Sequence, residues 1–162
     1  MHVHWRRLAG RLAAIGLAVV ALVAASSAGA SAAPAASFRI QNQYNSHCLV
    51  NYARGGPLYV GNCQDDAYRY WNLISTNQTS TYLIQNARNG SCLSYNGSSL
   101  VSAACDGLDG NQYWHLGPLA GGTPIWWGVT NRCLSVTGPR GVYVHNPCNG
   151  TSKYDIWKSP PG

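Results

Sequence analysis

Glutamate is absent from this 162-residue sequence, so its only acidic side chains are five aspartates. They fall in loop-like segments such as "QDD" and "CDGLDGN", which makes them weak candidates for the paired carboxylates of a glycosidase. The sequence also lacks a G-x-S-x-G nucleophile elbow, and each histidine stands alone. We therefore expect no catalytic residues and no enzyme activity, and a small hydrolase that depends on one aspartate is kept as an alternative.

Clustered positive charge is missing as well. Arg6, Arg7 and Arg11 precede an apolar run near the N-terminus, and the other eight basic residues are scattered singly along the chain. Beyond residue 32 those eight face five aspartates, so the net charge there is +3 rather than the +6 of the whole sequence. Nucleic-acid binding needs a basic stripe or patch, so we expect no nucleic-acid partner.

The first 32 residues have the pattern of a secretory signal peptide. Basic residues lead into the apolar run Leu12 to Ala25, and "AGASA" supplies small residues for cleavage after Ala32. The run is shorter than the roughly 18 residues that span a bilayer, which disfavours a membrane anchor. We expect a signal peptide at 1–32, a linker at 33–36 and one domain at 37–160, exported by the general secretory or the twin-arginine route.

Tryptophan and cysteine recur with one period in the remaining chain. Trp71, Trp114 and Trp157 are 43 residues apart, and the six cysteines fall into three successive pairs: Cys48 with Cys63, Cys92 with Cys105, and Cys133 with Cys148. An even cysteine count in an exported chain indicates disulfides, and spacings of 13 to 15 residues lack the close pairing of zinc sites. We expect three local disulfides and no metal.

The segments before each first cysteine are also similar to one another, so the repeat includes more than tryptophan and cysteine. "FRIQNQYNSHCLV" from Phe38 aligns without a gap on "YLIQNARNGSCLS" from Tyr82, whereas the third copy, "IWWGVTNRCLSV", is interpreted as one residue shorter in its turn. Short runs such as "YLIQ" and "VYVH" predict strands, and "NARNGS" and "YNGSS" predict turns. No helical period is sustained, so the fold class is all-β and closed.

These residues resemble the ricin B-type lectin domain. The resemblance rests on "CLV" and two "CLS" segments at the first cysteines, and on "RYW", "QYW" and "DIW" at the tryptophans. It implies a β-trefoil of three repeats of about 43 residues with one disulfide per repeat, in which a six-stranded barrel is capped by three hairpins. It also implies that Trp71, Trp114 and Trp157 lie in the core.

The resemblance implies a shallow sugar site in each repeat, built from three parts. The family's aspartate position holds Val50, Ser94 and Ser135, and its aromatic position holds Gly61, Ala103 and Asn146. The Asn-Gln pair before the tryptophan is kept only in repeat two, as Asn111-Gln112, because repeats one and three have Tyr68-Arg69 and Tyr154-Asp155 there. Repeat one therefore lacks a family-type site.

Repeat two supplies the candidate carbohydrate-binding residues Asn111, Gln112, Ser94 and Tyr95. Gln112 and Asn111 serve equally well as structural residues of a turn, and the two interpretations stay open. Tyr52 and Tyr95 follow their "CL" cysteines closely, so they are either relocated stacking residues or packing for the hairpins. Trp126 and Trp127 add further aromatic surface.

The sequence therefore predicts a secreted, extracellular, monomeric and non-catalytic carbohydrate-binding module with partly degenerate sites. Its expected partner is a galactose-, xylose- or arabinose-type glycan, with no cofactor and no membrane contact after signal removal. The alternative is a secreted protein–protein interaction module such as a peptidase inhibitor.

Overall fold

The computed structural model describes residues 37–117, 123–128, 130–148 and 150–158. The predicted signal peptide and linker lie outside these residues, as do residues 159–160 of the predicted domain. Among the helices of the described chain, none has the length and apolar character needed to cross a membrane.

Seven strands form a closed antiparallel ring. Strand β1 pairs with β5, followed in order by β6, β9, β10, β13 and β2, and only Ile40 separates β2 from β1. The ring is therefore a six-stranded barrel in which β1 and β2 share one position. Its strands are β1 (Phe38–Arg39), β2 (Gln41–Asn42), β5 (Tyr70–Ser75), β6 (Thr81–Asn86), β9 (Trp114–Leu116), β10 (Thr123–Trp127) and β13 (Ile156–Lys158).

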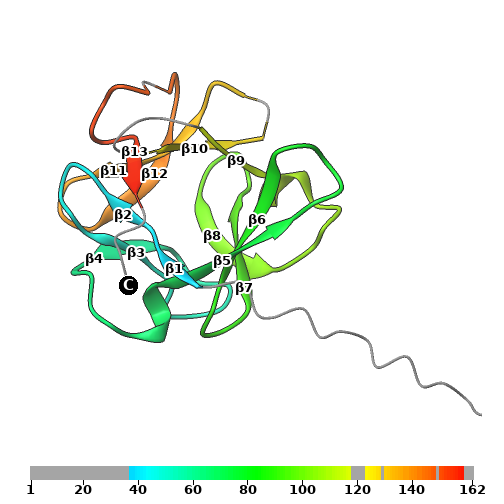
Figure 1. The fold of residues 1–162 in the computed structure, drawn as a ribbon, viewed down its shortest axis with the longest axis horizontal. Helices are drawn as coiled ribbons and strands as arrows, with labels where there is room; N and C mark the ends of the chain where they lie inside the picture. Colours follow the sequence, from blue (N-terminus) through cyan, green and yellow to red (C-terminus); the bar gives the residue numbers. More distant parts are fainter. Residues whose placement is uncertain (1–36, 118–122, 129, 149, 159–162) are drawn as a thin grey trace, which may run out of the picture. The chain divides into compact units, whose positions relative to one another are not determined.

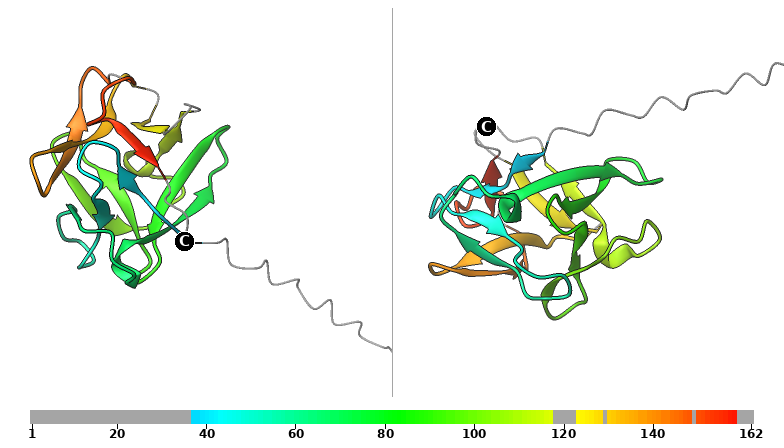
Figure 2. Two further views of the ribbon diagram at one scale, coloured as in Figure 1. Left: turned by 60° about the vertical axis from the view of Figure 1, so that its left-hand side comes forward. Right: turned by 90° about the horizontal axis from the view of Figure 1, so that it is seen from below.

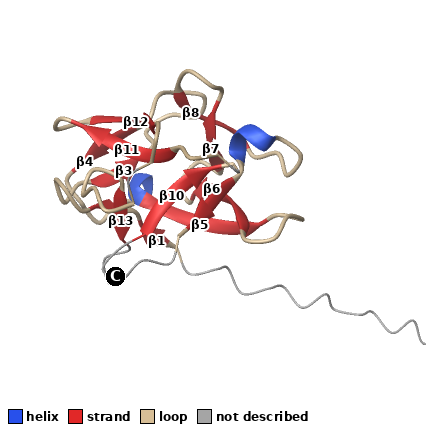
Figure 3. Ribbon diagram, turned by 90° about the horizontal axis from the view of Figure 1, so that it is seen from above, coloured by secondary structure: helices blue, strands red, loops and turns tan. Residues whose placement is uncertain are grey.

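Three hairpins extend from this ring, one from each of β2, β6 and β10. In Figure 1 they are coloured cyan to teal, light green and orange, and Figure 3 shows β7, β8, β11 and β12 on the side away from β1, β5 and β13. We call β1–β5 unit one, β6–β9 unit two and β10–β13 unit three. The hairpin strands are β3 (Cys48–Val50), β4 (Tyr59–Gly61), β7 (Ser91–Tyr95), β8 (Leu100–Ala104), β11 (Cys133–Thr137) and β12 (Gly141–His145).

The turn-forming clusters end the strands where the sequence predicts. After β6, the Asn86 side-chain oxygen accepts from the backbone N–H groups of Arg88 and Asn89, and Gly90 has a φ of 68° that suits glycine. The turn between β7 and β8 repeats this chemistry, because the side chain of Asn96 accepts from the two residues after Gly97. Figure 2 shows these turns projecting from the barrel in two further views.

The three repeated tryptophans lie in the centre of the described fold, as predicted. Trp71, Trp114 and Trp157 are at most 1% exposed. Each indole N–H donates to the carbonyl oxygen of the buried leucine that follows its unit's first cysteine, over 2.8–3.1 Å: Leu49, Leu93 and Leu134 respectively. A buried indole needs such an acceptor, so burial of the ring and attachment of the hairpin are achieved by the same side chain.

Each predicted disulfide is present within its own unit. Cys48 is bonded to Cys63, Cys92 to Cys105 and Cys133 to Cys148. The bond joins the first strand of each hairpin to the segment that follows the second strand, so it closes the loop that contains the hairpin turn. The all-β trefoil with one disulfide per unit is therefore confirmed.

The predicted shortening of the third turn is wrong. Trp127 pairs with Trp114 in the register at which Asn86 pairs with Trp71 and Asn42 with Trp157, so the spacing to the following cysteine is the same in all three units. The indole N–H of Trp127 donates to the Asn111 carbonyl, just as the amides of Asn86 and Asn42 donate to the corresponding carbonyls of neighbouring units. Trp127 thus stands where the other two units have asparagine. Because the two residue types differ in shape, the sequence comparison did not align them.

We predict that Trp114→Ala lowers the free energy of unfolding by about 3–5 kcal/mol, because it removes a large buried ring and leaves the Leu93 carbonyl without its donor. Leu108→Ala is the control, since that side chain is 83% exposed and its loss should change stability by under about 0.5 kcal/mol. Chemical denaturation of the two variants and the parent measures both effects. Equal midpoints for the parent and Trp114→Ala would contradict the core assignment.

Candidate functional site

One buried position recurs two residues before each core tryptophan, and we call it the pre-tryptophan position. It holds Arg69 in unit one, Gln112 in unit two and Asp155 in unit three, which are 4%, 2% and 0% exposed. In each unit the backbone N–H of this residue donates to the carbonyl three residues earlier, over 2.9–3.2 Å. The backbone is thus equivalent in the three units, while the side chain is a cation, a neutral amide or a carboxylate.

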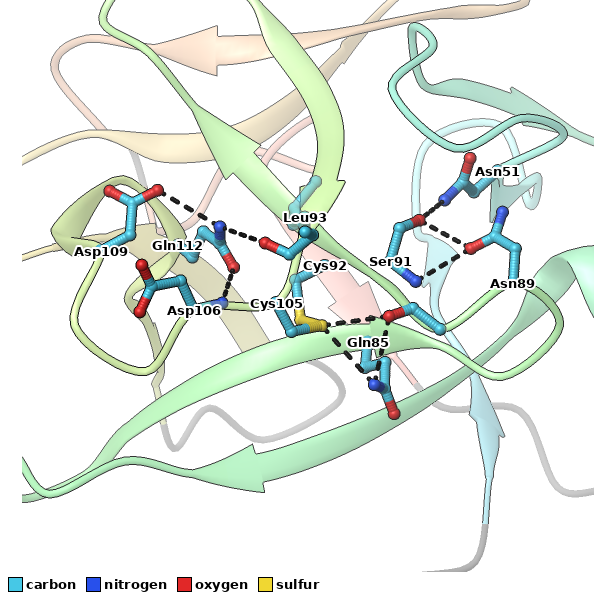
Figure 4. Close-up of a disulfide and its surroundings, with 12 residues drawn as sticks. Asn51, Gln85, Asn89, Ser91, Cys92, Leu93, Cys105, Asp106, Asp109 and Gln112 are labelled. Carbon is cyan, nitrogen blue, oxygen red and sulfur yellow. Dashed lines mark hydrogen bonds between the residues drawn. A yellow bond between two sulfur atoms is a disulfide. The ribbon is translucent and has the colours of Figure 1, made fainter.

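Gln112 is held by three hydrogen bonds (Figure 4). Its amide nitrogen donates to the Ala104 carbonyl at 2.8 Å and to the Asp109 carboxylate at 3.2 Å, and its oxygen accepts from the Asp106 backbone N–H at 3.1 Å. Asp109 also caps the short 3₁₀ helix η2 (Gly110–Gln112) through the Asn111 N–H. Gln112 therefore joins the end of the hairpin to the loop before Trp114.

Arg69 makes the matching contacts in unit one. Its Nε donates to the Asn62 carbonyl at 2.6 Å, and one guanidinium nitrogen forms an ion pair with Asp66, which caps the 3₁₀ helix η1 (Ala67–Arg69). Asn62 and Asp66 correspond by position to Ala104 and Asp109. Among the described residues, the other guanidinium nitrogen, Nη2, is bonded only to the Tyr52 hydroxyl, at 3.4 Å.

Asp155 makes a different contact in unit three, because a carboxylate cannot donate to a carbonyl. One of its oxygens lies 3.2 Å from Nδ1 of His145, a half-buried residue of β12. The cysteines nearest to it form a disulfide, so the one cluster of metal-ligating residue types in the described chain, Cys133, Cys148 and Asp155, offers no thiolate to an ion.

The family's aspartate position is buried in all three units. Val50 and Ser135 are fully buried, and Ser94 is 5% exposed. The Ser135 hydroxyl donates to the Tyr154 carbonyl at 3.3 Å. These side chains therefore present little polar surface to a ligand.

Asn111 and Tyr95 meet at Trp127. The Tyr95 ring packs edge-on against the Trp127 ring with centroids 4.8 Å apart, and its hydroxyl donates to the Gly97 carbonyl. The Trp127 indole N–H in turn donates to the Asn111 carbonyl, and Asn111 itself is exposed. The structure thus brings together Asn111, Tyr95 and half-buried Trp127, whereas the Gln112 side chain is used within the fold. Trp126 has no described side chain.

The hollow in unit one was not predicted. It has a volume of about 790 Å³ and is lined by residues of units one and three, among them Val50, Gly61, Arg69 and Arg140. The first three occupy the family's aspartate, aromatic and glutamine positions, so the hollow lies where the sugar site of repeat one would be. The arginine in "RYW" and the nearby Tyr52 were the available sequence signals.

Tyr70 of unit one and Tyr154 of unit three each have a raised pKa. The Tyr70 hydroxyl donates to Asp65 at 2.8 Å, and this hydrogen bond raises its pKa. The pKa of Tyr154 is raised chiefly by its hydrogen bond with Tyr44, whose ring centroid lies 4.1 Å away. Both shifts favour the neutral phenol, so at neutral pH these groups contribute no negative charge.

Comparison with known proteins gives one family. The model of the ricin-type beta-trefoil lectin domain matches residues 36–157, while the search of curated proteins finds no match. Members of this family are generally non-catalytic domains.

Solved structures share the fold at low identity. The cytolethal distending toxin of Actinobacillus actinomycetemcomitans superposes with a TM-score of 0.67 at 19% identity, over 77% of this chain and 90% of that one. SeviL bound to asialo-GM1 saccharide gives 0.63 at 17% identity, over 76% and 94%. An endo-β-galactosidase from Clostridium perfringens that releases GlcNAcα1-4Gal gives 0.67 at 13% identity, over 78% of this chain but 32% of that one.

We predict that Gln112→Ala destabilises the fold by about 1–3 kcal/mol, because the hydrogen bonds of the buried Gln112 amide to the Asp106 N–H and the Ala104 carbonyl are lost. Gln112→Arg should lose less stability than Gln112→Ala, since Arg69 makes the equivalent contacts in unit one. Thermal denaturation compares these variants with Asn111→Ala, whose exposed side chain should cost under about 0.5 kcal/mol. A fully stable Gln112→Ala would mean that this amide is free for a ligand.

Proposed function

Because the chain belongs to the ricin-type β-trefoil lectin family, we propose that it is a secreted, non-catalytic carbohydrate-binding module. The observation that carries the proposal is the family match over residues 36–157, which includes every described strand except the last residue of β13. The saccharide bound by SeviL, a protein of the same fold, adds support from a distant relative.

In unit two, the proposed site is the surface around Asn111 and Trp127. The exposed amide of Asn111 supplies donors and an acceptor for sugar hydroxyls, and the half-buried ring of Trp127 offers an apolar face. Tyr95 supports that ring from beside it rather than stacking on the sugar directly, since it is only 8% exposed. Gln112 acts here as the residue that fixes the loop carrying Asn111.

The affinity of this site should be low. Loss of the family's carboxylate removes charge-assisted hydrogen bonds of about 1.5–3 kcal/mol, and buried Ser94 does not replace them. This corresponds to an affinity about 10- to 100-fold weaker than that of an intact site. Galactose-, xylose- and arabinose-type glycans remain the proposed ligands, bound by a monomer.

Secretion is supported by the sequence pattern of residues 1–32 and by the three disulfides, which persist in oxidising compartments. Export of the full chain from a bacterial host, followed by N-terminal sequencing of the secreted product, tests this part of the proposal. A mature N-terminus at Ala33 is expected.

We predict that Asn111→Ala weakens binding of neutral oligosaccharides by about 3- to 10-fold, the effect of losing one neutral hydrogen bond. Titration of the parent and the variant with galacto-, xylo- and arabino-oligosaccharides at millimolar concentrations measures the change. Asn77→Ala is the matched control, because Asn77 is also an exposed loop asparagine but lies in the turn between β5 and β6.

Equal binding by Asn111→Ala and the parent would place the neutral ligand outside unit two. Absence of binding to any saccharide, neutral or charged, would contradict the proposed function. Assays of peptidase inhibition on the same preparation would then test the interaction-module alternative.

A further inference from the structure

The hollow of unit one combines two arginines with no acidic residue. Arg69 comes from the 3₁₀ helix before β5, Arg140 comes from the turn between β11 and β12, and none of the described residues that line the hollow is an aspartate. Arg140 is exposed and takes part in no ion pair among the described residues. Its backbone is tied to β4, because its carbonyl accepts from the Val60 N–H at 3.1 Å.

Gly61 leaves room beside the guanidinium group of Arg69, whose side chain is only 5% exposed. A Cβ atom at position 61 would lie 3.6 Å from Nη2 of Arg69 and 3.7 Å from the Val50 side chain, so any larger side chain would grow into this space. The family's aromatic residue is missing at that point. Since Asp66 and the Asn62 carbonyl occupy the other nitrogens, Nη2 is the atom of Arg69 left to bind a ligand from the hollow.

Aromatic surface stands beside these cations. Tyr52 and Tyr59 are 54% and 41% exposed, and their ring centroids are 6.5 Å apart with the planes tilted by 43°. Tyr52 also lies 5.5 Å from the Tyr68 ring and is bonded to Arg69, so it is held in place on the side of the hollow. The flat face of a pyranose ring can stack on such a ring.

The charges favour a ligand with a single negative charge. Asp66 offsets the charge of Arg69, so the two arginines together leave a surplus of about one positive charge near the hollow. A carboxylate matches this surplus and can accept from Arg69 Nη2 and from the Arg140 guanidinium. A phosphate group, with close to two negative charges at neutral pH, would leave part of its charge unpaired.

We propose that the hollow of unit one binds an acidic saccharide, with the sugar carboxylate between Arg69 and Arg140 and the ring against Tyr52 or Tyr59. This inference rests on the proposed function, to which it adds a second site with a different ligand class. Hexuronic acids and sialic acids share the required chemistry, a carboxylate on a sugar ring.

The first experiment compares an oligogalacturonide with its methyl ester, which has the same size and hydroxyl groups but no charge. We expect the acid to bind about 10- to 100-fold more tightly than the ester. Raising the ionic strength from about 0.1 M to about 1 M should weaken binding of the acid but not binding of the ester. A parallel titration with N-acetylneuraminic acid distinguishes a sialic acid from a hexuronic acid.

Variants locate the binding. Arg140→Gln and Arg69→Gln should each lower the affinity for the acidic saccharide about tenfold or more, and the latter should fold because glutamine makes the equivalent contacts at Gln112. Lys158→Gln is the control: it removes the same charge from an exposed residue of β13 that does not line the hollow. Circular dichroism confirms folding of each variant.

Equal affinity for the acid and the ester, or equal loss in Lys158→Gln and Arg140→Gln, would overturn the inference. Binding of neutral oligosaccharides that is sensitive to Asn111→Ala would in that case leave the proposed function standing. Absence of binding to both neutral and acidic saccharides would contradict the two together.

Discussion

Three hydrogen bonds between indole N–H groups and leucine carbonyls organise the described fold. Each connects a barrel strand to the hairpin of its own unit through fully buried groups, where water is not available as a substitute partner. Because the indole fixes both the leucine strand and its own, the residues just before each tryptophan are placed beside the hairpin's end. The pre-tryptophan position owes its common geometry to this arrangement.

Much of the fold could be predicted from the sequence because its main determinants are local and repeated. The tryptophan period, the cysteine pairs and the turn clusters each occur three times, so one unit's pattern supports the others. The role of Trp127 was not predicted, since it depends on an indole N–H that donates to the Asn111 carbonyl of another unit. A residue-type alignment cannot recognise that a large indole and a small amide supply the same donor.

The candidate sites were less predictable. Asn111 and Gln112 are adjacent in a motif, yet one side chain is exposed and the other is enclosed by Ala104, Asp106 and Asp109. The hollow of unit one depends on Arg140, which reaches unit one only through contacts between distant hairpins. Such contacts follow from the three-dimensional arrangement of the units and leave no spacing pattern in the sequence.

The division of one barrel position between β1 and β2 has a consequence for how the molecule is made. β2 pairs with β13, while β1 pairs with β5, so the ring is complete only when residues near opposite ends of the described chain have met. During synthesis, β13 is made after every other described strand, because it follows them all along the chain. The growing chain therefore has units one and two available as hairpins but lacks the β13 residues that pair with Gln41 and Asn42 across the barrel, so closure of the barrel must await unit three.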